Sequence, residues 1–216
     1  MDGRTAKCYN SDLSSFRSGV YVSSIQSAFV ANIFNKEVER RRSHNAKYRN
    51  SCAFGLEFWY HLWKKDQVAQ DYARSISLFS FQHLLIPYQR SVPRKDNGPI
   101  YNHTSLFHID LTKKEKQVVI LDSLGLLKKE DDTVVMLKDF LETEYFSQFK
   151  SRITFRVLVR ECSKETKYLY PGVFAMANMA EIMFPSTKTF LEKDMESVHR
   201  QFIEMINAKR YLDLFK

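Results

Sequence analysis

The stretches Thr104-Ser-Leu-Phe-His-Ile-Asp-Leu111 and Gln117-Val-Val-Ile-Leu-Asp122 decide the fold of this 216-residue chain. Both are short and apolar, with the β-branched and aromatic residues that are typical of buried strands. The segment between them, Thr112–Lys116, is mostly charged and predicts a turn. We therefore expect the two stretches to form a β-hairpin.

Hydrophobic periodicity predicts helices on both sides of this hairpin. The helical spacing of apolar residues, with Ser or acidic residues at several starts, predicts helices over 21–34, 52–64, 131–141, 172–184 and 194–208. Short apolar runs predict further strands over 82–88, ending at a proline, and over 153–159. An order of helices, then strands, then helices favours an α+β fold over a doubly wound sheet.

The composition is that of one globular domain. Hydrophobic residues make up 44% of the chain and aromatic residues 14%, and its length suffices for one substantial core or at most two small ones. Only 6 Gly and 5 Pro are present and no linker is evident, so we expect a single domain over 1–216. No apolar run approaches the roughly 20 residues that cross a bilayer, and the first residues lack a secretory pattern, so no membrane partner is expected.

The three cysteines, Cys8, Cys52 and Cys162, are odd in number and widely spaced. This usage predicts free thiols in a reducing, intracellular environment rather than a disulfide framework. No Cys-x-x-Cys pair or His/Cys group has zinc-site spacing, so neither a structural metal nor a cofactor is expected.

The net charge of +8 favours an acidic partner. The densest basic run is Lys36–Arg42, followed by Lys47–Arg49, and it could bind phosphate or act as a nuclear-localisation signal. We prefer to interpret it as a solvated helix end, because Lys and Arg there offset the helix dipole. Nucleic-acid binding stays an alternative, although no helix-turn-helix, RRM or zinc-finger signature supports it.

One His and one Asp stand at the ends of the predicted hairpin. His103 opens the first strand and Asp122 closes the second. Adjacent antiparallel strands can place two such residues side by side, the pairing that orients an imidazole as a general base. A His and an Asp at hairpin ends are more often solvated polar residues, so this pair alone is a weak signal.

Four parts of the sequence share a pattern with one known family: residues 12–25, 78–88, His103–Leu111 with Leu121–Ser123, and 199–206. They resemble the Ulp/SENP cysteine proteases of the adenain-like superfamily, which process SUMO and related ubiquitin-like proteins. His103–Leu111 with Leu121–Ser123 is similar to the family's His-Trp-x-Leu-x-x-Ile-Asp … Asp-Ser block. Residues 12–25 resemble the entry to its first helix, 78–88 a strand ending in Ile-Pro, and 199–206 its closing helix. The ordered matches cover nearly the whole chain. They imply the papain-like (adenain-like) α+β fold, a central mixed or antiparallel sheet flanked by helices.

The same resemblance implies an incomplete catalytic site. When the family's Cys-Pro-Gln-Gln-x-Asn-x-x-Asp-Cys-Gly-x-Phe segment is laid without gaps on Cys162–Phe174, the oxyanion glutamine falls on Glu165 and the nucleophile on Pro171. Proline has no side-chain heteroatom and cannot attack, although it suits the first residue of a helix. A carboxylate at 165 would repel the developing negative charge. His103 and Asp122 would then be vestigial.

The positions that hold the modifier's tail differ as well. Where the family has an aromatic residue directly after its His, this chain has Thr104. The family's Trp-Leu-Asn-Asp segment corresponds to residues 21–24, from Tyr21 to Ser24. We therefore expect a degenerate cleft for the modifier's tail, formed by these positions together with Gly172. These losses favour a pseudoprotease that serves as a protein-interaction module or scaffold subunit.

Its expected partner is another protein, with SUMO or a related modifier as a further candidate. A protease with a displaced thiol stays an alternative. We expect a nuclear location, with the cytoplasm as the alternative.

Overall fold

The computed structural model describes residues 24–45, 50–93, 100–166, 170, 172–184 and 189–212. The helices are α2 (Ser24–His44), α3 (Leu56–Trp63), α4 (Gln67–Ser75), α5 (Asp132–Phe149), α6 (Val173–Met183) and α7 (Met195–Ala208). The strands are β1 (Ser51–Ala53), β2 (His83–Val92), β3 (Tyr101–Asp110), β4 (Gln117–Leu121) and β5 (Arg156–Arg160). Short 3-10 turns cover Leu78–Ser80 and Glu192–Asp194. Among the described residues, no helix combines the length and the apolar character that a membrane span needs.

The strands form one mixed sheet in the order β1-β2-β3-β4-β5. The three central strands are antiparallel, whereas β1 and β5 run parallel to their neighbours. The predicted hairpin is confirmed: β3 and β4 pair from Leu106 opposite Leu121 to Asp110 opposite Gln117. This register puts the residue after β4 near the first half of β3, which is where His103 lies.

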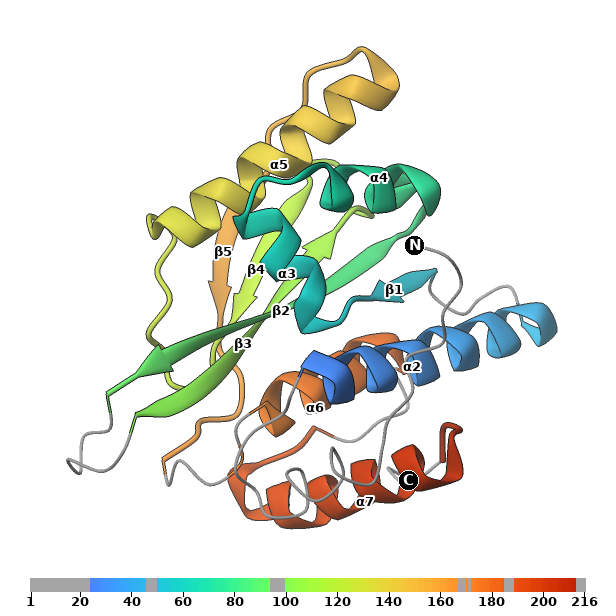
Figure 1. The fold of residues 1–216 in the computed structure, drawn as a ribbon, viewed down its shortest axis with the longest axis vertical. Coiled ribbons are helices and arrows are strands. Elements are labelled where there is room, and N and C mark those ends of the chain that lie inside the picture. Colours follow the sequence, from blue (N-terminus) through green and yellow to red (C-terminus); the bar gives the residue numbers. More distant parts are fainter. Residues whose placement is uncertain are drawn as a thin grey trace.

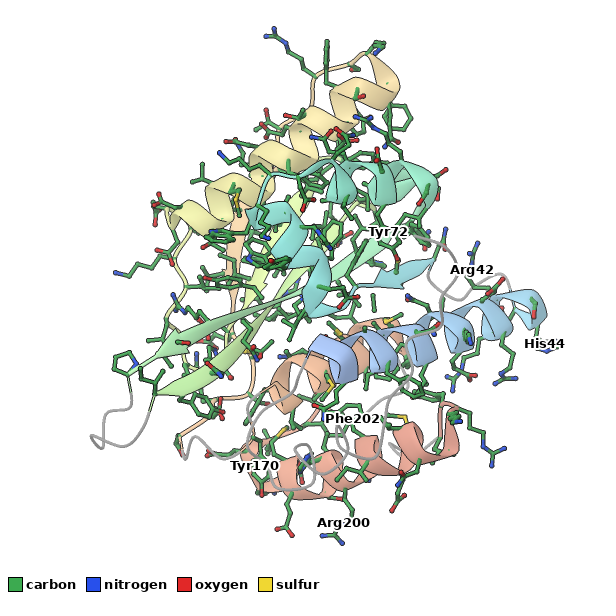
Figure 2. The ribbon with its side chains drawn as sticks, viewed as in Figure 1. Arg42, His44, Tyr72, Tyr170, Arg200 and Phe202 are labelled. Carbon is green, nitrogen blue, oxygen red and sulfur yellow. The ribbon has the colours of Figure 1, made fainter. Side chains whose placement is uncertain are left out.

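Helices cover both faces of the sheet (Figure 1). The α2, α6 and α7 helices lie on one face, and α3, α4 and α5 lie on the other. Because side chains alternate along a strand, each face has its own apolar cluster. The first cluster includes Phe34, Leu85, Leu106, Met183 and Phe202. The second includes Phe58, Ile86, Phe107, Val118 and Leu137. Phe202 extends from α7 toward α2 (Figure 2), where its ring lies 6.2 Å from that of Phe34.

Several predicted boundaries are wrong. The helix predicted over 52–64 begins only at Leu56, because Cys52 belongs to β1 and pairs with Leu84 of β2. The α4 helix was not predicted, although Asp66 caps it by accepting a hydrogen bond from the Val68 N–H. The β2 strand continues past Pro87 to Val92, so the proline does not end it.

Candidate functional site

The paired strands bring His103 and Asp122 together. The Nε2 atom of His103 lies 2.6 Å from Oδ1 of Asp122, and both side chains are 1% exposed. The Asp122 carboxylate also accepts hydrogen bonds from the backbone N–H groups of Leu124, Leu126 and Leu127 at 2.7–3.0 Å. The aspartate therefore fixes the imidazole and the loop that follows β4.

Glu165 places a second carboxylate beside the same ring. Its Oε2 atom lies 3.5 Å from Nδ1 of His103. The Tyr101 hydroxyl donates to the other oxygen, and Ser123 Oγ lies 3.4 Å from Oε2. The Glu165 backbone N–H donates to the Ser123 carbonyl at 3.1 Å, which ties the segment after β5 to the end of β4. The buried imidazole thus lies between two buried carboxylates.

This arrangement favours a charged imidazole. Burial by itself lowers the pKa of His103, but the hydrogen bond to Asp122, the nearby Glu165 carboxylate and the negative charges of both outweigh it, so the pKa is raised above its ordinary value. Burial opposes ionisation of Asp122, yet His103 and the backbone N–H groups hold the pKa of that carboxyl well below its usual range. On the other side of Asp122, Nη2 of Arg90 lies 3.9 Å from Oδ2.

The described thiols are not partners of this imidazole. Burial raises the pKa of Cys52, in β1, to about 12. Burial also raises the pKa of Cys162 to about 11, against the lowering effect of Lys164. Within the described residues, the Nδ1 atom of His103 has no hydrogen-bond partner and Nε2 bonds to Asp122, so neither thiol is hydrogen-bonded to the ring. Cys8 lies outside the described residues.

Pro171 and Tyr21 also lie outside the described residues. The structure does describe Gly172, which adopts a left-handed backbone conformation (φ 82°) directly before α6. The α6 helix begins at Val173, one residue after the predicted start at 172. The reason is the conformation of Gly172, since a positive φ interrupts a right-handed helix and suits glycine.

The remaining predicted cleft residues lie on separate elements. Thr104 is buried in β3, and its hydroxyl accepts a hydrogen bond from the Gln89 side chain at 3.4 Å. Ser24 is the first residue of α2. Sequence reasoning missed Tyr101 and Ser123 as partners of Glu165. Their positions in the sequence could have indicated them, because Tyr101 lies two residues before His103 on one strand and Ser123 directly follows Asp122.

We predict that His103 makes stability depend on pH. Because its pKa is raised in the folded protein, its contribution is complete below about pH 6.5 and is lost as the pH rises through the folded-state value. Urea unfolding at a series of pH values from about 5.5 to 9 should show this decline, and His103→Gln should flatten it. The exposed His44 provides the control, since His44→Gln should keep the wild-type slope. An unchanged slope in His103→Gln would contradict the prediction.

Neither a family profile nor a curated protein sequence matches the chain. Solved structures do match. The SUMO protease Ulp1 with its catalytic cysteine oxidised to a sulfenic acid aligns with TM-score 0.70 and 16% identity, over 97% of this chain and 89% of that one. The C-terminal Ulp1 protease domain in complex with Smt3, the yeast ortholog of SUMO, aligns with TM-score 0.64 and 16% identity, over 92% and 82%.

The catalytic domain of the Chaetomium thermophilum Ulp1-like SUMO protease aligns with TM-score 0.63 and 14% identity, over 92% of this chain and 77% of that one. At such identities the likeness establishes a shared architecture. The chain therefore has the fold of the Ulp1-like cysteine proteases, a mixed sheet flanked by helices, and the predicted fold is confirmed.

Proposed function

We propose that the chain is a catalytically inactive Ulp/SENP-like domain that acts as a protein-interaction module or scaffold subunit. The observation that carries the proposal is Pro171, which occupies the nucleophile position in the gap-free alignment and has no group that can attack a carbonyl. A domain that keeps this fold without a nucleophile still offers a surface for binding.

The charge arrangement at Glu165 supports the same conclusion. In a thiol protease, the imidazolium is balanced by a thiolate that then attacks the substrate. Here the Glu165 carboxylate, 3.5 Å from Nδ1 of His103, supplies the negative charge. Asp122 holds the opposite nitrogen. The ring thus lies between two carboxylates, and neither of them is the thiolate that a cysteine protease uses for attack.

A displaced thiol is disfavoured as the source of activity. With a pKa of about 11, Cys162 is almost entirely protonated at neutral pH, whereas the thiolate is the attacking form. Cys52 is buried in β1, with a pKa raised to about 12.

Nucleic-acid binding through the basic run is also disfavoured, because its arginines already have partners. Glu37 accepts hydrogen bonds from Arg40 and Arg41 at 2.7–2.8 Å. The guanidinium of Arg41 also lies 5.0 Å from the Phe184 ring centroid. Arg42, at the C-terminal end of α2 (Figure 2), donates to the Asn50 side chain at 2.6 Å. This run therefore serves as the end of a packed helix.

For the partner, we propose another protein first and SUMO or a related modifier second. The solved complex of the Ulp1 domain with Smt3 supports a modifier as the partner. The net charge of +8 supports it too, because it would attract the acidic surface of SUMO. The small Thr104 and Ser24, at positions where the family has a clamp, favour a different protein. A nuclear location, with the cytoplasm as the alternative, remains a prediction.

Two measurements test the proposal together. Vinyl-sulfone or propargyl probes built on SUMO, NEDD8 and ubiquitin should form no adduct with the protein, because Pro171 stands at the nucleophile position of the alignment and neither described thiol is hydrogen-bonded to His103. Adducts that disappear on changing Cys8, Cys52 or Cys162 to Ser would overturn the inactive state. Titration of isotope-labelled SUMO with the protein, followed by NMR, then distinguishes the two candidate partners. An absence of chemical-shift changes at millimolar protein would exclude SUMO and leave a different protein as the partner.

A further inference from the structure

A buried group of metal-ligating side chains lies at the other end of β3 from His103. His83 begins β2, and His108 and Asp110 lie at the end of β3. The register places His83 opposite Asp110 and Leu85 opposite His108, so the three side chains share one face of the sheet. His103 precedes Asp110 by seven residues, which at the usual rise of a strand amounts to roughly 23 Å. The group is therefore separate from the His103 site and independent of the proposed function.

The distances within this group suit a small divalent ion. The Nδ1 atom of His83 lies 2.9 Å from Nε2 of His108 and 3.8 Å from Oδ1 of Asp110. One ligand atom from each residue lies within 4.8 Å of the other two. Tetrahedral zinc, with bonds of about 2.0–2.1 Å, holds its ligand atoms about 3.3 Å apart. The distances from His83 to His108 and to Asp110 bracket that spacing, and the 4.8 Å limit leaves the three ligand atoms close enough to converge on one ion after side-chain adjustment.

The chemistry of the donor set narrows the choice of ion. Two imidazoles and one carboxylate suit Zn²⁺ and its neighbours Co²⁺ and Ni²⁺, whereas Mg²⁺ and Ca²⁺ prefer oxygen ligands throughout. All three residues are buried, at 3–5% exposure. A buried carboxylate is costly unless its charge is balanced by a partner or a metal ion. The Thr112 hydroxyl and N–H donate to Asp110 Oδ1 at 2.6 and 3.0 Å, and such outer contacts commonly orient a metal ligand.

We propose that His83, His108 and Asp110 bind one divalent transition-metal ion, with Zn²⁺ preferred and a fourth position filled by water. Ser51 of β1 pairs in register with His83 and is 3% exposed. Its Oγ has no hydrogen-bond partner within the described part of the chain, and it could bond to that water. The ion would tie the start of β2 to the end of β3 and so stabilise the sheet.

The test uses the whole chain after treatment with a chelator. Competition with a chromophoric zinc chelator should give one Zn²⁺ per chain with a Kd below about 1 μM, and Zn²⁺ should raise the unfolding temperature. Co²⁺ should give the visible absorption of a tetrahedral site. Asp110→Asn and His83→Gln should each weaken binding by about 100-fold or more, since even outer-shell changes cost 10–100-fold.

His61→Gln is the matched control, because His61 also pairs with an aspartate, Asp66, at 2.9 Å but lies outside the group. This variant should bind Zn²⁺ as the wild type does. If His83→Gln fails to fold by circular dichroism, His108→Gln replaces it. An absence of Zn²⁺ and Co²⁺ binding by the wild type would overturn the proposal and leave a plain hydrogen-bonded network. Equal affinity in Asp110→Asn would overturn it too, by placing the ion elsewhere.

Discussion

Replacing Asp122 with alanine is expected to lower the free energy of unfolding by about 3–5 kcal/mol, the usual cost of removing one partner of a buried ion pair. The substitution would leave the buried His103 ring without its 2.6 Å acceptor. It would also leave the N–H groups of Leu124, Leu126 and Leu127 without the oxygens that accept from them. Each buried donor without an acceptor adds to the destabilisation.

Urea unfolding at neutral pH measures this effect. Asp122→Asn should lower the free energy of unfolding less than Asp122→Ala, because the amide oxygen can still accept hydrogen bonds from the backbone N–H groups. Asp71→Ala is the control, since Asp71 is an exposed residue of α4 and its loss should change the stability by no more than about 0.5 kcal/mol. A loss below about 1 kcal/mol in Asp122→Ala would mean that the pair contributes little to the fold.

The β3–β4 hairpin could be predicted because its signals are local. Apolar runs and a charged turn lie within one short stretch, and the structure pairs Leu106 with Leu121 as that pattern implies. The β1 strand could not be predicted, because three residues form a strand here only through pairing with β2, some thirty residues later. The 52–53 segment on its own continues the apolar pattern of α3, so its sequence predicts a helix.

The site shows the same division between local and distant information. The places of His103 and Asp122 at the hairpin ends indicate a pair, and the gap-free alignment points to Glu165. The contacts of Glu165 could not be predicted, because Ser123 and Tyr101 lie 42 and 64 residues away in the sequence. Likewise, the spacing of His83 and His108 resembles no zinc motif, and only the strand register brings them together.

Replacing Glu165 is expected to have the second-largest effect on the stability of the fold. Glu165→Ala is expected to lower the free energy of unfolding by about 1.5–3 kcal/mol, the range for hydrogen bonds to charged groups. The substitution removes the carboxylate from Nδ1 of His103 and leaves the buried Tyr101 hydroxyl without its acceptor. Glu165→Gln should lose less, because its amide oxygen can accept from Tyr101 while its charge is gone.

A double-mutant cycle with His103→Gln separates charge from packing. If Glu165 stabilises the imidazolium, Glu165→Ala should cost less in the His103→Gln background, with a coupling above about 0.5 kcal/mol. The coupling should shrink as the pH rises through the folded-state pKa of His103, because a neutral ring gains little from a second carboxylate. Glu196→Ala, which breaks an exposed pair with Arg200, should show no coupling. Additive losses for Glu165 and His103 at every pH would mean that Glu165 fills space beside the ring without pairing with it, and the carboxylate could then not stand in for a thiolate.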